Sequence, residues 1–140
     1  MADASVFMDT AGFLALWDAS DEHHARALRL QSELARRRRK LVTTDYIVDE
    51  TVTLLLVRHS HAAAVDFLRT LQATQWIELV WIDSERFDAA AELFLRNDDK
   101  EYSFTDDVSF AVMHELGLQD AFTTDHHFRQ AGFNPLLRRH

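Results

Sequence analysis

The sequence predicts an α/β fold of three layers, α/β/α, with a mainly parallel central sheet. Short apolar runs alternate with longer segments whose apolar residues recur at helical spacing, which is typical of right-handed crossovers between parallel strands. The chain has 140 residues, of which 47% are hydrophobic, 3 are glycine and 1 is proline. No linker or low-complexity tract divides it, so we expect residues 1–140 to form a single domain with one core.

The N-terminal part predicts one strand and two helices. Residues 5–8 are a short apolar run that ends at Asp9, as expected of a buried strand. Residues 10–19 carry apolar side chains at helical spacing. Ser20 is a favourable N-cap for a second helix, which would continue to a block of basic residues.

The middle of the chain continues the alternation. Residues 41–43 predict a short strand, residues 44–60 a helix, and residues 62–71 a further helix. Residues 76–82 are the most strand-like run, because they are rich in β-branched and aromatic side chains. A helix that includes residues 89–94 follows.

A polar loop separates this helix from the next one. The loop covers residues 97–101, and Ser103 and Asp106 then form the S-x-x-D pattern of a capping box. Gly117 suits the position that stops the helix, because glycine adopts a left-handed conformation without strain.

Two acidic residues follow predicted strands directly. Residues 121–124 predict the last core strand, which ends at Asp125, and residues 133–137 are a candidate edge strand. Asp9 follows the first strand in the same way. Ligands of such sheets bind outside the carboxyl ends of the strands, so we expect both aspartates at the binding edge.

Charge and composition restrict the function classes. The formal net charge of -8 argues against a passive nucleic-acid binder, although carboxylates that recruit cations can still receive a phosphate. The absence of cysteine excludes disulfides, thiolate metal sites and cysteine nucleophiles. With no apolar run of membrane-spanning length and no signal-like N-terminus, we expect a soluble, cytoplasmic protein.

One concentrated basic block has two interpretations. It is either a solvated helix end, whose cations favour the negative pole of the helix dipole, or a rim that tracks phosphates. The block consists of Arg36, Arg37, Arg38, Arg39 and Lys40.

Four carboxylates form the candidate site: Asp9, Glu50, Asp106 and Asp125. Each has a structural alternative, because the two at strand ends could cap helices and the glutamate could be a solvated helix position. Asp106 differs, since Phe110 and Met113 place it on a helical stripe expected to face the interior. A buried carboxylate needs a cation or a hydrogen-bond donor.

Joint placement of the carboxylates would favour a metal ion. Two carboxylates about 5 Å apart repel by roughly 3 kcal/mol at an effective dielectric of about 20. They must share protons or hold a cation, and an all-oxygen site selects Mg²⁺ or Mn²⁺ over zinc. Such ions activate water for attack on phosphorus. Four hydroxyl residues are placed to orient metal-bound water or the phosphate: Thr10, Ser103, Thr105 and Thr124.

Four segments carry a recognisable order and spacing. They read Val-Phe-Met-Asp-Thr at residues 6–10, Thr-Asp-Tyr-Ile-Val-Asp-Glu-Thr at residues 44–51, Tyr-Ser-Phe-Thr-Asp at residues 102–106 and Thr-Thr-Asp-His-His-Phe at residues 123–128. Together they resemble the PIN domain, and specifically the VapC toxins of bacterial toxin–antitoxin pairs. The resemblance covers essentially the whole chain.

The resemblance implies a Mg²⁺- or Mn²⁺-dependent endoribonuclease, a homodimer, and a VapB-like antitoxin whose C-terminal segment covers the active site. RNA is then the substrate, and the basic block becomes a candidate RNA contact. By matched position, the four carboxylates would bind metal or act in catalysis, with Thr10 and Thr105 nearby. Asp107 departs from the expected small or apolar residue. It lies about 100° around the helix from its neighbour, so we expect it to be solvated or a secondary contact.

Other functions are less well supported. A haloacid-dehalogenase-like phosphatase would need a second aspartate where Ala11 stands. Zinc hydrolysis by an H-E-x-x-H motif is disfavoured, because His114 lacks the second histidine, and the adjacent histidines at 23–24 and 126–127 are expected to diverge at the surface. The alternative from another class is a non-catalytic PIN-like module that binds RNA or protein, which retention of all four acids disfavours.

Overall fold

Strands and helices alternate in the structure, a computed structural model that describes residues 4–138. No helix in this part of the chain is long and apolar enough to cross a membrane. The elements are β1 (Val6–Met8), α1 (Thr10–Trp17), α2 (His24–Arg36), β2 (Leu41–Thr44), α3 (Asp45–Arg58), α4 (His61–Ala73), β3 (Ile77–Val80), α5 (Ser84–Arg96), α6 (Phe104–Leu116), β4 (Asp120–Phe122), α7 (His126–Gln130) and β5 (Asn134–Pro135).

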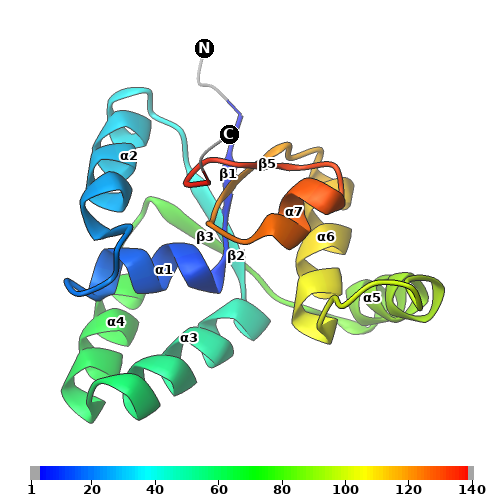
Figure 1. Cartoon of the computed structure of the whole chain (residues 1–140), viewed down its shortest axis with the longest axis horizontal. Coiled ribbons are helices and arrows are strands. Elements are labelled where there is room, and N and C mark those ends of the chain that lie inside the picture. Colours follow the sequence, from blue (N-terminus) through cyan, green and yellow to red (C-terminus); the bar gives the residue numbers. More distant parts are fainter. Residues whose placement is uncertain (1–3, 139–140) are drawn as a thin grey trace.

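The strands form one parallel sheet of five in the order β3-β2-β1-β4-β5. The central strand β1 pairs with β2 and β4, so that Phe7 lies opposite Val42 on one side and Ala121 on the other. In Figure 1, α1 to α4 lie to the left of and below the strands, and α5 to α7 lie to their right. The predicted three-layer α/β/α fold with a parallel sheet is therefore confirmed.

Aromatic side chains fill the space between the sheet and both helical layers. Phe13 of α1 meets Phe67 of α4 edge to face, with ring centroids 4.9 Å apart. On the other side, Phe128 of α7 lies between Phe7 of β1 and Phe110 of α6, at 6.3 and 5.0 Å. All five rings are essentially buried, so the central strand is covered on both faces, as expected of a parallel sheet.

Close packing of α1 on β4 depends on Gly12. A Cβ atom at this position would lie 2.1 Å from the carbonyl oxygen of Phe122 and 2.8 Å from its ring. Only glycine allows the helix to approach the strand backbone so closely. This contact places Asp9, just before α1, beside the residues that follow β4.

Two sequence-based expectations about the elements need correction. Ser20 is not the N-cap of α2, which begins at His24; instead, its backbone and hydroxyl donate to the Asp18 carboxylate at 2.9 and 2.6 Å. The Asp18 side chain thus holds a turn that separates the two helices. The strand predicted over residues 76–82 is shorter, at Ile77–Val80, and lies at the sheet edge.

Candidate active site

Asp9 lies at the carboxyl end of β1 with its side chain directed toward β4. The residue is only 6% exposed, and its Oδ2 atom accepts a hydrogen bond of 2.7 Å from the Thr123 hydroxyl. Although Asp9 occupies the N-cap position of α1, its side chain makes no capping hydrogen bond. The simple capping role therefore does not account for this carboxylate.

The ionisation of Asp9 is strongly perturbed. The pKa of Asp9 is raised from 3.8 to about 7, chiefly because burial removes solvation of the carboxylate. The hydrogen bond from Thr123 lowers this pKa, and the negative charges of Asp125 and Asp106 contribute to the rise. Asp9, Asp106 and Asp125 therefore lie close enough for their charges to interact. A bound cation would relieve both the desolvation and the repulsion.

Asp106 reaches the same site from the first turn of α6. The Ser103 hydroxyl accepts from the Asp106 backbone N–H at 3.0 Å, and Asp106 Oδ2 accepts from the Ser103 N–H at 3.1 Å. This is the capping box that the sequence predicts, and it is confirmed. Burial raises the pKa of Asp106, the Ser103 hydrogen bond lowers it, and the Asp125 charge raises it again. The Asp106 side chain therefore caps α6 and also belongs to the acidic site.

Thr123 connects Asp9 with Asp125, although nothing in the local sequence distinguishes it from Thr124. Its Oγ1 atom donates to Asp9 and accepts a hydrogen bond of 3.0 Å from the Asp125 backbone N–H. Thr123 is fully buried. Its neighbour Thr124, the predicted site residue, instead offers its carbonyl oxygen to Arg138 at 3.3 Å. The hydrogen bond to Asp9 is therefore made by Thr123 and not by Thr124.

His127 also belongs to the site. Its Nδ1 atom lies 3.1 Å from Asp106 Oδ2 and 3.5 Å from Asp125 Oδ1, and its side chain is only 18% exposed. The expected divergence of the two adjacent histidines is wrong, because the ring centroids of His126 and His127 are 4.4 Å apart. Both residues start α7, where successive side chains do not point in opposite directions as they do in an extended segment.

Glu50 lies on α3, on a helix face that also carries a contact with α6. One turn earlier on α3, the Tyr46 ring packs against Phe104 at the start of α6, with centroids 6.2 Å apart. Residues four apart share a helix face, so Glu50 lies on the side of α3 that meets the Asp106 helix. Within residues 4–138, no hydrogen bond joins Glu50 to the aspartates, so its role stays a prediction.

The predicted hydroxyl residues occupy different environments. Thr10 is 5% exposed, and its Oγ1 atom has no hydrogen-bond partner within the described residues. A buried hydroxyl without a partner is unfavourable, which suits a position that binds a ligand or water. The Ser103 hydroxyl is occupied by the α6 cap. Thr105 is half-buried, and its carbonyl accepts from the Ser109 hydroxyl at 3.0 Å.

Asp107 is not solvated, contrary to the expectation from helical geometry. It is fully buried, and one oxygen accepts a hydrogen bond of 3.1 Å from the Asn97 side chain. Burial raises the pKa of Asp107, and the Asn97 hydrogen bond lowers it. Leu93 and Asn97, at the end of α5, and Tyr102 of the following loop lie with Asp107 around one cavity, so this side of α6 is covered by other parts of the chain.

The basic block lies at the amino ends of the parallel strands, whereas the aspartates lie at their carboxyl ends. β2 begins immediately after the block, whereas Asp9 follows the end of the parallel strand β1. Arg39 forms a largely buried ion pair of 2.9 Å with Asp120 at the start of β4, and it also donates to the Ala4 carbonyl. Arg39 is therefore a structural residue, and this placement does not support contact between the block and RNA bound at the aspartates.

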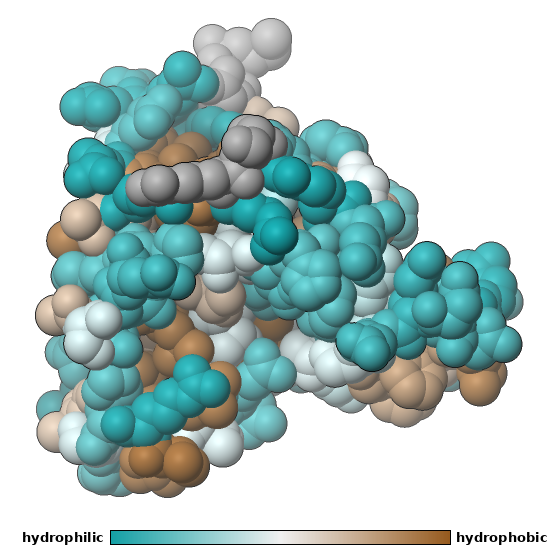
Figure 2. Space-filling view, in the orientation of Figure 1, coloured by the Kyte–Doolittle hydropathy of each residue, from teal (hydrophilic) through white to brown (hydrophobic). Residues whose placement is uncertain are grey.

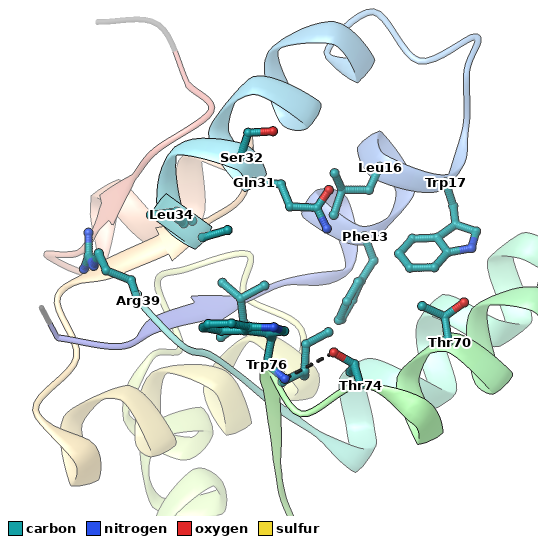
Figure 3. Close-up of a pocket in the computed structure, with 13 residues that line it drawn as sticks. Phe13, Leu16, Trp17, Gln31, Ser32, Leu34, Arg39, Thr70, Thr74 and Trp76 are labelled. Atoms are coloured by element: carbon teal, nitrogen blue, oxygen red, sulfur yellow. Dashed lines mark hydrogen bonds between the residues drawn. The ribbon is translucent and has the colours of Figure 1, made fainter. Parts of the chain in front are cut away.

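A separate cavity of about 310 Å³ lies between α1, α2 and α4 and has a mainly apolar lining. Figure 3 shows Phe13, Trp17 and Trp76 around it, with Arg39 at one end. None of the predicted site carboxylates lines this cavity. We therefore place the candidate active site at the aspartates and not at this cavity.

The donor set at the aspartates fits a divalent cation. Carboxylate oxygens are the preferred ligands of Mg²⁺ and Mn²⁺, and crowding already disfavours their ionised forms without a cation. Donor atoms of Asp125, His126 and His127 lie within 4.8 Å of one another, a spacing that one ion can bridge. The unpartnered Thr10 hydroxyl next to Asp9 is a further polar group for which a bound ion, its water or a phosphate would provide a partner.

Comparisons with known proteins agree with the fold and the site. The PIN domain family model matches residues 6–134. A 23S rRNA-specific endonuclease, VapC20 of Mycobacterium tuberculosis, is 35% identical over 128 residues, covering 91% of this chain and 95% of the relative. A VapC ribonuclease of Archaeoglobus fulgidus is 28% identical over 117 residues, covering 82% of this chain and 74% of the relative.

A solved structure extends the similarity to three dimensions. The crystal structure of Mycobacterium tuberculosis VapC20, described as a Sarcin-Ricin loop cleaving toxin, matches with a TM-score of 0.84 and 35% sequence identity. The match covers 92% of this chain and 96% of the other. With the parallel sheet and the aspartates gathered at its edge, these matches show that the chain belongs to the PIN-domain family.

Proposed function

We propose that this chain is a Mg²⁺- or Mn²⁺-dependent endoribonuclease, the toxin of a VapBC-type toxin–antitoxin pair. The observation that carries the proposal is the approach of Asp9, Asp106 and Asp125 from three separate segments. Thr123 is hydrogen-bonded to both Asp9 and Asp125, and His127 Nδ1 lies 3.1 Å from Asp106 and 3.5 Å from Asp125. Packing alone does not explain such a cluster, because like charges in a partly desolvated site repel. The VapC names of the relatives support the same activity.

Each residue has a defined task in this proposal. Asp9, Asp106 and Asp125 would hold the divalent ion, with Glu50 of α3 as a further candidate ligand. When bound, the ion would supply an activated water for attack on phosphorus and would stabilise the leaving oxygen. Thr123 orients Asp9 through its 2.7 Å hydrogen bond. The buried Thr10 hydroxyl is available to donate to a phosphate oxygen.

An RNA-cleavage assay tests the proposal directly. We expect the purified chain to cut RNA with Mg²⁺ or Mn²⁺, and EDTA to abolish cleavage. Asp9→Asn should reduce the rate by at least about 100-fold, because it removes a buried carboxylate ligand. Asp49→Asn is the matched control, because Asp49 is exposed on α3 and should keep full activity. Cleavage that survives EDTA would contradict the metal-dependent mechanism.

The alternative function is a non-catalytic module that binds RNA or protein. If the chain is such a module that binds RNA, it should bind RNA without cutting it, whether or not Mg²⁺ or Mn²⁺ is present. Asp9→Asn should then bind RNA as well as the wild type does. The buried Asp9, with its pKa raised to about 7 and two further aspartates beside it, favours the enzyme.

We further propose ribosomal RNA as the substrate class, supported by the 23S rRNA-specific relative at 35% identity. A toxin of this kind would act in the cytoplasm. Incubation with ribosomes, followed by primer extension, should give one dominant cut in 23S rRNA. Equal cleavage of unrelated RNAs would argue against this substrate while leaving the nuclease activity intact.

A VapB-like antitoxin is the proposed protein partner. Three partly desolvated carboxylates attract a cation, and an arginine from the partner would form charge-assisted hydrogen bonds among them. The product of a neighbouring small reading frame should co-purify with the chain and block cleavage. Expression of the chain alone without growth arrest would weaken the toxin assignment.

We propose that the active form is a homodimer. Large apolar side chains are exposed on α5, where Phe87, Phe94 and Leu95 are 44, 46 and 77% exposed. Figure 2 shows apolar surface at the lower right, below the polar face of α5. Exposed clusters of this kind commonly mark interfaces. The wild type should sediment as a dimer, and Leu95→Arg should lower the sedimentation coefficient to that of a monomer. A wild type that sediments as a monomer would contradict the proposal.

A further inference from the structure

The His127 ring brings a nitrogen atom into the acidic site. Its Nδ1 atom is 3.1 Å from Asp106 Oδ2 and 3.5 Å from Asp125 Oδ1. A nitrogen lone pair cannot face carboxylate oxygens at these distances without repulsion, so a proton or a metal ion must lie between them. Nδ1 can therefore donate a hydrogen bond when it carries the ring proton, and it can bind a metal ion when the proton is on the other ring nitrogen.

The separations of these atoms suit neighbouring ligands of one ion. Metal–ligand bonds of about 2.1 Å in an octahedral site place adjacent ligands about 3 Å apart. The distances of 3.1 and 3.5 Å from His127 to the two aspartates are close to this value. His127 Nδ1 is therefore within the spacing of neighbouring ligands from each of the two aspartates.

The His127 ring is also held in its orientation by the protein. Asp125 Oδ1 accepts a hydrogen bond of 2.9 Å from the His127 backbone N–H, which fixes the start of α7. The ring packs edge-on against Tyr102, with centroids 5.3 Å apart, and its side chain is 18% exposed. His126, at 52% side-chain exposure, is far less constrained. Orientation by surrounding groups is characteristic of metal-ligating histidines.

We propose that Nδ1 of His127 is a direct ligand of the divalent ion, beside the aspartates, and that it makes the site prefer Mn²⁺ to Mg²⁺. The inference rests on the metal-dependent function proposed above. Imidazole nitrogen binds transition-metal ions better than it binds Mg²⁺, which demands oxygen ligands.

Electron paramagnetic resonance of the full chain loaded with Mn²⁺ alone tests this ligand. Electron spin-echo envelope modulation should show coupling of the Mn²⁺ spin to one imidazole ¹⁴N, and ¹⁵N-histidine labelling should change that coupling. His127→Gln should remove the coupling and weaken Mn²⁺ binding by about tenfold, with a smaller effect on Mg²⁺. His61→Gln, which changes an exposed histidine of α4, is the control and should keep both the coupling and the affinity. His126→Gln tests whether the neighbouring imidazole is the ligand instead.

The outcomes separate the two proposals. Bound Mn²⁺ without nitrogen coupling in the wild type overturns the ligand role of His127 and leaves the carboxylate metal site standing. Coupling lost in His126→Gln but kept in His127→Gln also overturns it. Failure of the wild type to bind Mn²⁺ at all overturns both the ligand assignment and the metal-dependent nuclease. Because ¹⁵N-histidine labelling of the wild type shows directly whether a histidine nitrogen binds Mn²⁺, the test does not depend on the folding of a variant.

Discussion

At the residue scale, one hydroxyl decides how two carboxylates are arranged. The Thr123 hydroxyl donates to the Asp9 carboxylate at 2.7 Å and accepts from the Asp125 backbone N–H at 3.0 Å. It therefore links the residue after β1 to the segment after β4. Its hydrogen bond also opposes the desolvation that raises the pKa of Asp9. Thr123 therefore keeps Asp9 more readily ionised, and ionisation is what a metal ligand requires.

Thr123→Val tests this arrangement because it keeps the shape and removes the hydroxyl. We expect the free energy of unfolding to fall by about 1–3 kcal/mol, since a buried carboxylate oxygen and an N–H lose their partner. Mn²⁺ affinity should fall by about tenfold. Both are measurable by urea unfolding and calorimetric titration. Thr124→Val, the matched control, should leave metal affinity unchanged, and equal losses in the two variants would refute the role of Thr123.

The perturbed pKa of Asp9 predicts a pH dependence of stability. The pKa is about 7 in the folded chain but about 3.9 in the unfolded chain, so the folded state binds more protons between these values. The stability contributed by Asp9 is fully present below pH about 4 and is lost as the pH rises through about 7.

Urea unfolding of the metal-free protein at pH about 5 and about 8 measures this effect. We expect the wild type to lose more stability over this interval than Asp9→Asn does. Added Mn²⁺ should restore stability most strongly at the higher pH, where the carboxylates are ionised. An identical pH dependence of the two proteins would show that Asp9 does not titrate in this range.

At the element scale, the contact between α1 and β4 sets the distance between Asp9 and Thr123. Gly12 permits this contact, because a Cβ atom would lie 2.1 Å from the Phe122 carbonyl oxygen. Backbone cannot move aside as a flexible side chain can, so any larger residue must displace the whole start of the helix. Gly12 thus acts on the metal site without touching it.

Gly12→Ala should therefore affect both stability and metal binding. We expect a loss of at least about 1–3 kcal/mol from overpacking, together with weaker Mn²⁺ binding by the folded fraction. Gly117→Ala provides the control: Gly117 has a φ of 66° and no atom within 4 Å of its Cβ position. It should cost about 1–2 kcal/mol through backbone strain alone and leave Mn²⁺ affinity unchanged. If Gly12→Ala binds Mn²⁺ as tightly as the wild type does, the contact between α1 and β4 does not control the metal site.

At the scale of the whole molecule, the sequence predicted the layers, the parallel sheet and most elements. Periodicity and strand-end positions were sufficient, because they depend on local patterns of burial. The capping box at Ser103 and Asp106 was predicted for the same reason, since both partners lie within one helical turn.

Features that depend on contacts between distant segments could not be predicted in this way. Thr123 and Thr124 are equivalent in the local pattern, and only the pairing of β1 with β4 selects one of them for Asp9. Asp107 is buried because α5 packs against α6, and Arg39 is occupied by Asp120 across the sheet. His127 was expected at the surface, because the local sequence gives no sign of its contact with Asp106. That contact joins two segments that are far apart in the sequence.

The central claim is that one divalent ion is held where these segments meet. A crystal soaked in Mn²⁺ and measured for anomalous scattering tests it most directly. We predict an anomalous peak within coordination distance of Asp9, Asp106 and Asp125. The absence of a peak there, or a peak only at acidic side chains elsewhere on the molecule, would contradict the proposed metal site and the cleavage mechanism that depends on it.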